Sequence, residues 1–205
     1  MRTVTLQSIL LRAWQRAGND GSDISNIPSG AKTMMTAAAN ERIADCWEWA
    51  DWPELMRVES RTVQGDATNG YYIDYEQSGQ TAMGEVFGVL RDNPATHAAP
   101  RAIGYTLLGD AIRFPEDTDL PTTVWVNYRV RPTEYSASNL TATVPAVIAK
   151  AVGYMLTSDL QTEDGQLDKA LAMEQLAESE LISQRDKYYF QQGQPSMWTA
   201  RVNQY

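Results

Sequence analysis

The residue types that could do chemistry gather in one stretch, CWEWADWPEL, at positions 46–55. Three acids alternate there with three tryptophans, namely Trp47, Glu48, Trp49, Asp51, Trp52 and Glu54. Glycosidases place two acids across one cleft, and aromatic rings can grip a sugar, so this stretch raises a carbohydrate-binding or carbohydrate-cleaving function. It is also typical of a helix end whose tryptophans supply buried area. We expect packing, with Trp47, Trp52 and Pro53 in the core.

The remaining chemistry-bearing residues are few. His97, the single histidine, has no serine or cysteine motif beside it, so we expect a loop residue without a catalytic role. Cys46, the single cysteine, is expected to be a buried structural residue and cannot form an intrachain disulfide. One histidine and one cysteine do not make a zinc site of the usual kind, and the glycines match no phosphate-binding loop. The sequence therefore predicts no enzyme, no metal and no cofactor.

Composition narrows the class of protein further. The chain has 205 residues, of which 43% are hydrophobic, and a formal net charge of -9. This balance is that of a globular domain rather than a disordered chain. An acidic chain has no general attraction for phosphate, which disfavours broad nucleic-acid binding and attachment to an anionic membrane surface. No signal peptide and no apolar stretch of about 20 residues is present, so no membrane partner is expected.

Periodicity predicts an α+β fold in which helices flank strands. We predict four main helices, at 4–17, 30–50, 145–163 and 166–190, and an antiparallel β insertion at about 56–131. Pro53 is expected to end the second helix, and Thr143 to cap the third, with Pro145 in its first turn. In the clearest strand Val124, Val126 and Tyr128 share one side and form part of the core. Residues 1–190 are read as one domain and 191–205 as an extended tail.

Two apolar stripes are expected on the longer helices. On the second helix the stripe comprises Met34, Ala38, Ile43 and Trp47. On the fourth helix it comprises Leu167, Ala170, Leu171, Ala177 and Leu181.

Charge is unevenly distributed along the chain. Eight acids fall between Asp159 and Asp186, where the nearby bases are Lys169, Arg185 and Lys187. The region therefore carries about five of the nine net negative charges, as either a solvated helix face or a surface that repels nucleic acid. Residues 191–205 contain no acid at all.

The order of these elements resembles the head–tail connector (adaptor) family of tailed bacteriophages. The resemblance covers most of the chain: a helix, a second helix ending in WADWPEL at 49–55, a strand starting GEV at 84–86, and a V-x-V-x-Y-R-x-x-P strand at 124–132. A Val-Pro pair at 144–145 then leads into two helices and a polar tail.

The resemblance implies a structural virion protein of the neck, made in the host cytoplasm. It would form a homo-oligomeric, usually dodecameric ring below the portal, meet a downstream neck or tail protein, and let genomic DNA pass without specific binding. The C-terminal tail would dock on the portal. The docking residues expected there are Gln194, Met197, Trp198, Arg201 and Tyr205. A neck stopper or tail-completion protein, and an unrelated cytoplasmic scaffold, remain open alternatives.

Overall fold

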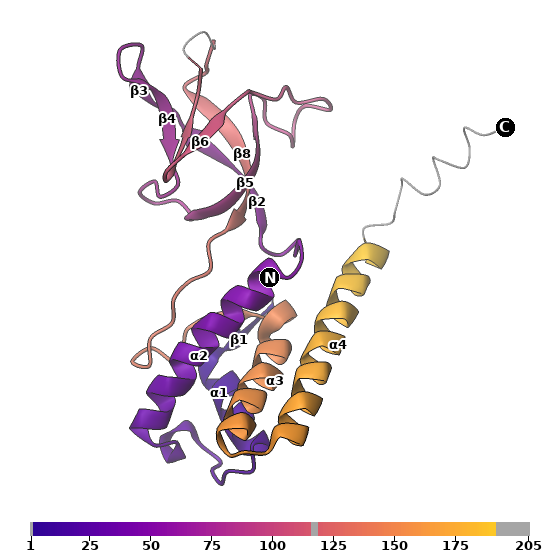
Figure 1. The fold of residues 1–205 in the computed structure, drawn as a ribbon. Helices are drawn as coiled ribbons and strands as arrows, with labels where there is room; N and C mark the ends of the chain where they lie inside the picture. The colour runs from indigo at the N-terminus through magenta and orange to yellow at the C-terminus, as the bar shows by residue number, and fades with distance from the viewer. Residues whose placement is uncertain (1, 116–118, 192–205) are drawn as a thin grey trace, which may run out of the picture. The chain divides into compact units, whose positions relative to one another are not determined.

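The computed structural model describes residues 2–115 and 119–191, and the side chains as far as Tyr188. Contacts within the chain divide it into two compact units (Figure 1). Leu55–Pro132 forms a sheet unit, and the chain on either side of it forms a helical unit. The predicted β insertion at 56–131 agrees with the sheet unit to within one residue at each end, although residues 1–190 were read as one domain.

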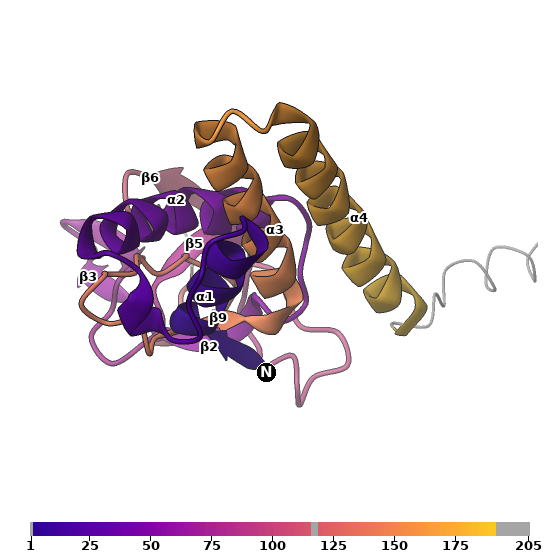
Figure 2. The same cartoon turned by 90° about the horizontal axis from the view of Figure 1, so that it is seen from below.

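Four α-helices make up most of the helical unit. They are α1 (Leu6–Arg16), α2 (Ser29–Glu48), α3 (Ala146–Glu163) and α4 (Leu167–Gln191), with a short 3-10 turn, η1 (Ile24–Asn26), between the first two. Helix α3 is the central helix, because it packs against each of the other three, while α4 makes extensive contact only with α3 among the described elements. Figure 2 shows α3 between α4 and the other two helices.

The residue types of α3 explain its central place. Ten of its residues are buried, and several are small, including Ala151 and Gly153. A Cβ at Gly153 would lie 3.4 Å from Nη1 of Arg16 and 3.8 Å from Cγ2 of Ile9, so a larger residue there would crowd α1. A helix that is apolar around most of its circumference is one that other helices surround.

A two-stranded sheet that the sequence analysis missed closes the helical unit. Strand β1 (Thr3–Thr5) pairs antiparallel with β9 (Thr143–Pro145). The prediction that a helix begins at residue 4 is therefore wrong: α1 begins at Leu6, and Thr5 is its N-cap. Thr143 does not cap α3, because it lies in β9 opposite Thr5; Pro145 holds the cap position without a side-chain hydrogen bond.

Two further sequence expectations concern the end of α2. The helix stops at Glu48, four residues earlier than Pro53 alone would require, and Trp49 is its C-cap. Trp47 and Trp52 are buried as predicted, but Pro53 is only half-buried, so its assignment to the core is wrong. Gly165, with φ +74°, separates α3 from α4, in agreement with the predicted helices at 145–163 and 166–190.

The sheet unit consists of two antiparallel sheets. One has the order β2 (Met56–Thr62), β8 (Thr123–Val130), β5 (Met83–Leu90). The other has the order β3 (Gln64–Asp66), β4 (Gly70–Asp74), β7 (Ala111–Arg113), β6 (Thr106–Leu108). A single core takes side chains from both sheets, including Ile73, Ile112 and the predicted Val124, Val126 and Tyr128, all fully buried. The α+β class, with four helices and antiparallel sheets, is confirmed.

Candidate functional site

The tryptophan-rich stretch forms the end of α2 and the turn after it. Trp52 is 1% exposed, and its indole Nε1 donates a 2.7 Å hydrogen bond to the carbonyl of Cys46. Its ring stacks on Trp49, with 6.0 Å between the ring centres, and meets the ring of Tyr188 edge-on at 6.5 Å. Stacked and edge-on pairs are the favoured aromatic geometries. The cluster therefore joins the end of α2 to the last turns of α4, two helices that lie on different sides of α3.

One acid of this stretch, Glu54, also links the end of α2 to α4. The hydroxyl of Tyr188 donates a 2.6 Å hydrogen bond to Oε1 of Glu54. Burial, followed by this bond, raises the pKa of Tyr188 to about 12. The guanidinium of Arg185 lies 5.5 Å from the centre of the Trp49 ring, within cation–π range. With Trp52 covered and Glu54 bonded to Tyr188, the geometry favours packing over a sugar site, which would need open aromatic faces and two acids across a cleft.

Neither of the other singled-out residues stands in a reactive arrangement. Cys46 is fully buried, with its Sγ 3.7 Å from Sδ of Met155, and burial raises the pKa of its thiol to about 12. The expectation of a buried cysteine is confirmed, and a thiolate is disfavoured at neutral pH. His97 is exposed, with Nδ1 3.1 Å from Oγ1 of Thr96. Among the described residues no three His, Cys, Asp or Glu side chains form a group that could hold a metal.

A charged cluster lies inside the sheet unit, where the sequence analysis had placed none. Arg61 of β2 pairs opposite Val124 and is fully buried. Its Nη2 donates to the carbonyl of Thr81 at 2.6 Å, to the hydroxyl of Tyr128 at 2.7 Å and to Oε2 of Glu59 at 3.2 Å. The Tyr128 hydroxyl in turn donates to the same Glu59 oxygen at 2.7 Å. Desolvation, with this bond next, raises the pKa of Tyr128.

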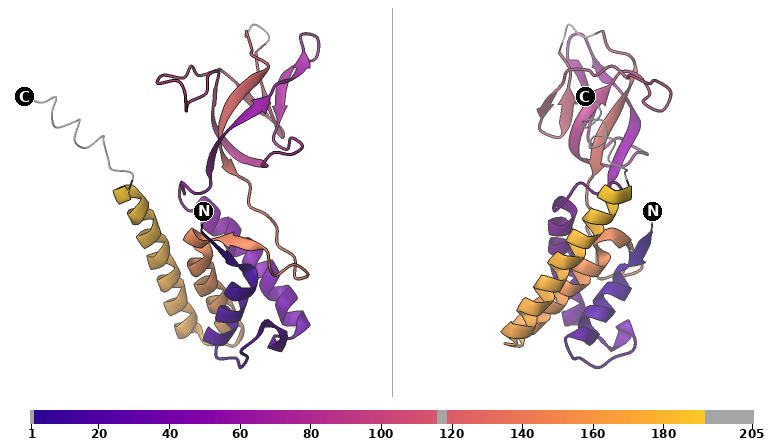
Figure 3. Two further views of the ribbon diagram at one scale, coloured as in Figure 1. Left: turned by 180° about the vertical axis from the view of Figure 1, so that it is seen from behind. Right: turned by 90° about the vertical axis from the view of Figure 1, so that its right-hand side faces the viewer.

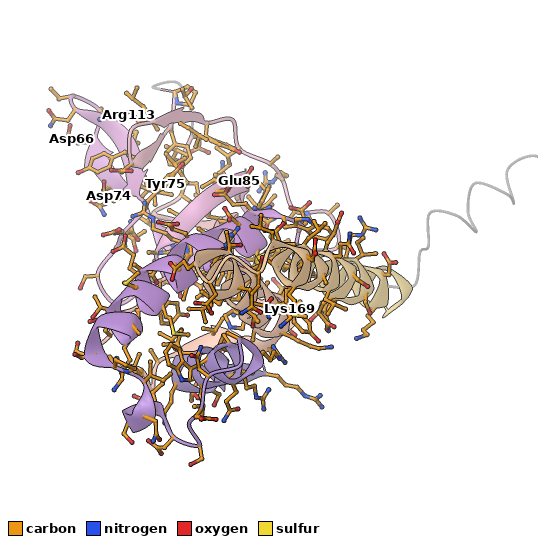
Figure 4. The ribbon with its side chains drawn as sticks, turned by 60° about the horizontal axis from the view of Figure 1, so that its bottom comes forward. Asp66, Asp74, Tyr75, Glu85, Arg113 and Lys169 are labelled. Atoms are coloured by element: carbon orange, nitrogen blue, oxygen red, sulfur yellow. The ribbon has the colours of Figure 1, made fainter. Side chains whose placement is uncertain are left out.

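This cluster gives β2 the character of a protected edge strand. Inward-pointing charges discourage a second strand from pairing at a sheet edge. A buried charge also costs free energy when it loses its partners, so a shift in the register of β2 would be unfavourable. The side chain of Gln77 covers the same edge by donating to the carbonyl of Thr62 at 2.8 Å, and Gln80 donates to that of Ser60 at 3.3 Å. We therefore read the cluster as a structural device of the sheet rather than as a catalytic site. Figure 4 shows Asp66 on β3, Arg113 on β7, and Tyr75 directly after the end of β4.

The acidic region at 159–186 lies on the last turns of α3 and along α4. Three of its eight acids have basic partners: Asp159 pairs with Arg42, Glu180 with Lys150, and Asp186 with Arg185. The other five form no ion pair within the described part of the chain: Glu163, Asp164, Asp168, Glu174 and Glu178. Lys169, labelled in Figure 4, donates to Oε1 of Gln166 at 2.8 Å. A solvated acidic surface is the result.

The apolar residues of α4 do not form the single stripe that was predicted. Ala170, Ala177 and Leu181 are buried against α3, whereas Leu167 is 65% and Leu171 57% exposed. Because α4 contacts little besides α3, its other faces are open (Figure 3).

A second group of exposed apolar residues therefore shares one face of α4, with the exposed acids Glu174 and Glu178 between Leu171 and Ile182. Ile182 is also exposed, and it lies eleven residues, or about three turns, beyond Leu171. We call Leu167, Leu171 and Ile182 the α4 apolar edge. Exposed apolar groups of this kind are candidates for contact with another protein.

The stripe expected on α2 is also partly wrong. Ile43 and Trp47 are buried, but Met34 is 61% exposed and Ala38 half-buried, and the buried positions of that half of the helix are Met35 and Ala39 instead. A signal for this shift is present in the sequence, since Met35, Ala39, Ile43 and Cys46 follow the spacing of four, four and three residues that defines one helix face.

The expected portal-docking residues, Gln194 to Tyr205, lie outside the described residues. The helices that the structure describes include none long and apolar enough to cross a membrane. The chain matches no protein-family model and no curated protein.

Proposed function

We propose that the chain is a structural virion protein, a head–tail adaptor that forms a ring of identical copies below the portal of a tailed bacteriophage. The ring, dodecameric by resemblance to the adaptor family, extends the DNA channel and links the head to a downstream neck or tail protein. In this proposal the helical unit is the adaptor body, the sheet unit is an insertion between its second and third helices, and residues 191–205 form the extended docking tail. The protein would be found in the virion neck, and in the host cytoplasm during assembly.

The observation that carries the proposal is the α4 apolar edge. Leu167, Leu171 and Ile182 are exposed along a helix whose extensive contacts among the described elements are with α3 alone. Burying a leucine or isoleucine side chain fully contributes roughly 1.5–3 kcal/mol, so three of them can supply a useful part of a subunit contact. A ring made of one kind of chain uses such a side surface in every copy, against a different surface of the next copy.

Charge on the same helices supports the passage of DNA. The five acids that form no ion pair within the described residues leave a negative surface on α3 and α4. A channel wall of that sign repels phosphate and does not hold it. Residues 191–205 contain one base, Arg201, and no acid. They also contain Trp198 and Tyr205, and tryptophan, tyrosine and arginine are the residue types that contribute most to protein interfaces.

Attachment to heads tests the proposal. Full-length protein is mixed with DNA-filled heads that bear the portal encoded in the same genome, and the heads are recovered by sedimentation. We expect the full chain to sediment with the heads. A chain ending at residue 191 should keep its far-UV circular dichroism spectrum and fail to attach. Attachment of the shortened chain at the normal level would contradict tail docking.

Substitutions on α4 separate ring formation from docking. Leu171→Asp places a charge on the α4 apolar edge and should reduce the number of copies bound per head. Leu176→Asp is the matched control, because Leu176 is exposed on another face of the same helix, five residues further on and about 140° around the helix axis. Equal occupancy for both variants would contradict the assignment of the apolar edge to subunit contact.

A further inference from the structure

An apolar groove lies within the helical unit, away from the α4 apolar edge. It has a volume of about 420 Å³ and is lined by side chains of α1, α2 and α3. Trp14 contributes from α1, Met34 and Ala38 from α2, and Leu156 and Leu160 from α3. Its volume falls in the range of sites that hold a ligand or a few side chains of a peptide.

The walls of the groove are built to accept a side chain. Met34 is 61% exposed although it is one of the larger apolar residues of α2. Methionine is unbranched and adapts to irregular partners, which is why it is common at surfaces that bind peptides. The small residues Ala31 and Ala38 on the same wall leave room between Met34 and α3.

One end of the groove is acidic. Asp159, Glu163 and Asp164 line it there. Asp159 is already paired with Arg42, whose Nε donates to its Oδ2 at 3.1 Å. Glu163 and Asp164 are exposed and form no ion pair within the described residues. A segment suited to this groove therefore has a large apolar side chain and, a few residues away, a base.

The C-terminal segment of the chain has that pattern. Residues 192–205 contain no acid, and Arg201 follows Met197 and Trp198 by three to four residues. We propose that the groove binds the C-terminal segment of a second copy of the chain, with Met197 and Trp198 against its apolar walls and Arg201 beside Glu163 and Asp164. This goes beyond the proposed function, because it concerns free copies and holds or fails without a portal.

The length of the chain after α4 indicates that the segment in the groove comes from a second copy. Helix α4 begins three residues after Asp164, at the acidic end of the groove, and carries the chain away from it for about 36 Å before Gln191. The ten residues from Gln191 to Arg201, the residue assigned to the acidic end, span at most about 36 Å when fully extended, which is no more than the length of α4 itself. The groove also lies on the α1 and α2 side of α3, opposite α4, which lengthens the path (Figure 2). The backbone of a chain's own Arg201 could therefore approach Glu163 and Asp164 only along a straight line beside α4, and the path around α3 is longer than that.

Intermolecular paramagnetic broadening tests the proposal with the full chain. One batch carries ¹³C-methyl methionine. The other is unlabelled and bears a nitroxide on Ser196→Cys. Cys46 stays unlabelled because it is fully buried and its thiol pKa is raised to about 12. In the mixture we expect the Met34 methyl signal to lose more than half its intensity and to recover when the nitroxide is reduced, whereas Met83, buried in the sheet unit, is unchanged.

Each other result overturns the proposal. An unaffected Met34 signal in the mixture means that the groove is not the docking site. Broadening that occurs only when the label and the nitroxide are on the same chain means that the segment folds back on its own groove. Broadening of Met173 on α4 without Met34 places the segment elsewhere.

Charge reversal checks the acidic end separately. Glu163→Lys combined with Asp164→Lys should restore most of the Met34 signal in the mixture. Asp168→Lys combined with Glu178→Lys makes the same change of charge on exposed positions of α4 outside the groove, and should leave the broadening intact. If both pairs act alike, the effect is one of net charge and the assignment of Arg201 to the groove is wrong.

Discussion

A leucine-to-alanine substitution should lower the free energy of unfolding far more on the buried side of α4 than on its exposed side. Leu181 is 1% exposed and packs towards α3, whereas Leu171 is 57% exposed on the α4 apolar edge. Leu181→Ala removes buried methyl groups and leaves a cavity, so we expect it to lower the free energy of unfolding of the helical unit by about 3 kcal/mol. Leu171→Ala removes a side chain that is only partly covered, and the higher helix propensity of alanine offsets part of that loss, leaving less than about 1 kcal/mol.

Urea denaturation measures both variants against the parent protein. Far-UV circular dichroism at 222 nm follows the helices, all of which in the described residues belong to the helical unit. With a slope of roughly 2 kcal/mol per molar urea, Leu181→Ala should move the midpoint of the helical transition down by about 1.5 M, and Leu171→Ala by less than about 0.5 M. Equal shifts would refute the reasoning, because they would mean that Leu171 is as buried in the folded protomer as Leu181.

Three further outcomes follow from the contacts. Glu59→Ala leaves buried Arg61 without its carboxylate, and should lower the free energy of unfolding of the sheet unit by about 1–3 kcal/mol in urea titration; a neutral effect would contradict the cluster. Because the pKa of Tyr188 is raised to about 12, its neutral phenol stabilises the fold fully below pH 10, and this contribution is lost as the pH rises towards 12. The urea midpoints of the parent and of Tyr188→Phe should therefore fall with different slopes over that range. Parallel curves would be evidence against the Glu54 contact. Cell-wall oligosaccharides should cause no saturable change in tryptophan fluorescence; a saturable change that Trp49→Ala abolishes would favour the carbohydrate alternative.

Local signals explain which parts of the fold could be predicted. The pairs Asn69-Gly70 and Gly109-Asp110 are typical of hairpin turns, and Gly70 and Gly109 have φ of +77° and +59°, a region that glycine adopts without strain. Alternation along 124–128 placed Val124, Val126 and Tyr128 on one side correctly. The β1–β9 pair could not be found in this way, because each strand has three residues and its partner lies about 140 residues away.

The surfaces were harder to predict than the elements. Apolar residues occur at two angles around α4, and nothing local says which of them meets α3. The face that meets α3 is the one on which the two helix backbones can come close together. Ala170 is small enough to allow this, and the hydroxyl of Ser158 on α3 donates a 2.9 Å hydrogen bond to its carbonyl. Leu167 and Leu171 are therefore left outside the contact, as the exposed edge on which the proposed function rests.

Arg61 was missed for a related reason. Charged residues at alternate positions of a strand are usually read as its solvent side. Here the apolar residues of β8 set the inward face, and register places Arg61 and Glu59 opposite Val124 and Val126. The pairing partner, which is 60 or more residues away, decides the face that β2 presents to the core.

Electron cryomicroscopy of the portal vertex is the measurement that tests the central claim most directly. DNA-filled heads are imaged with and without added full-length protein. The account predicts a closed ring of identical copies directly on the portal, with α4 at the boundary between neighbouring copies and a continuous channel through the centre. Density for the protein only at the tail side of the neck, or no added density at the vertex, would contradict it.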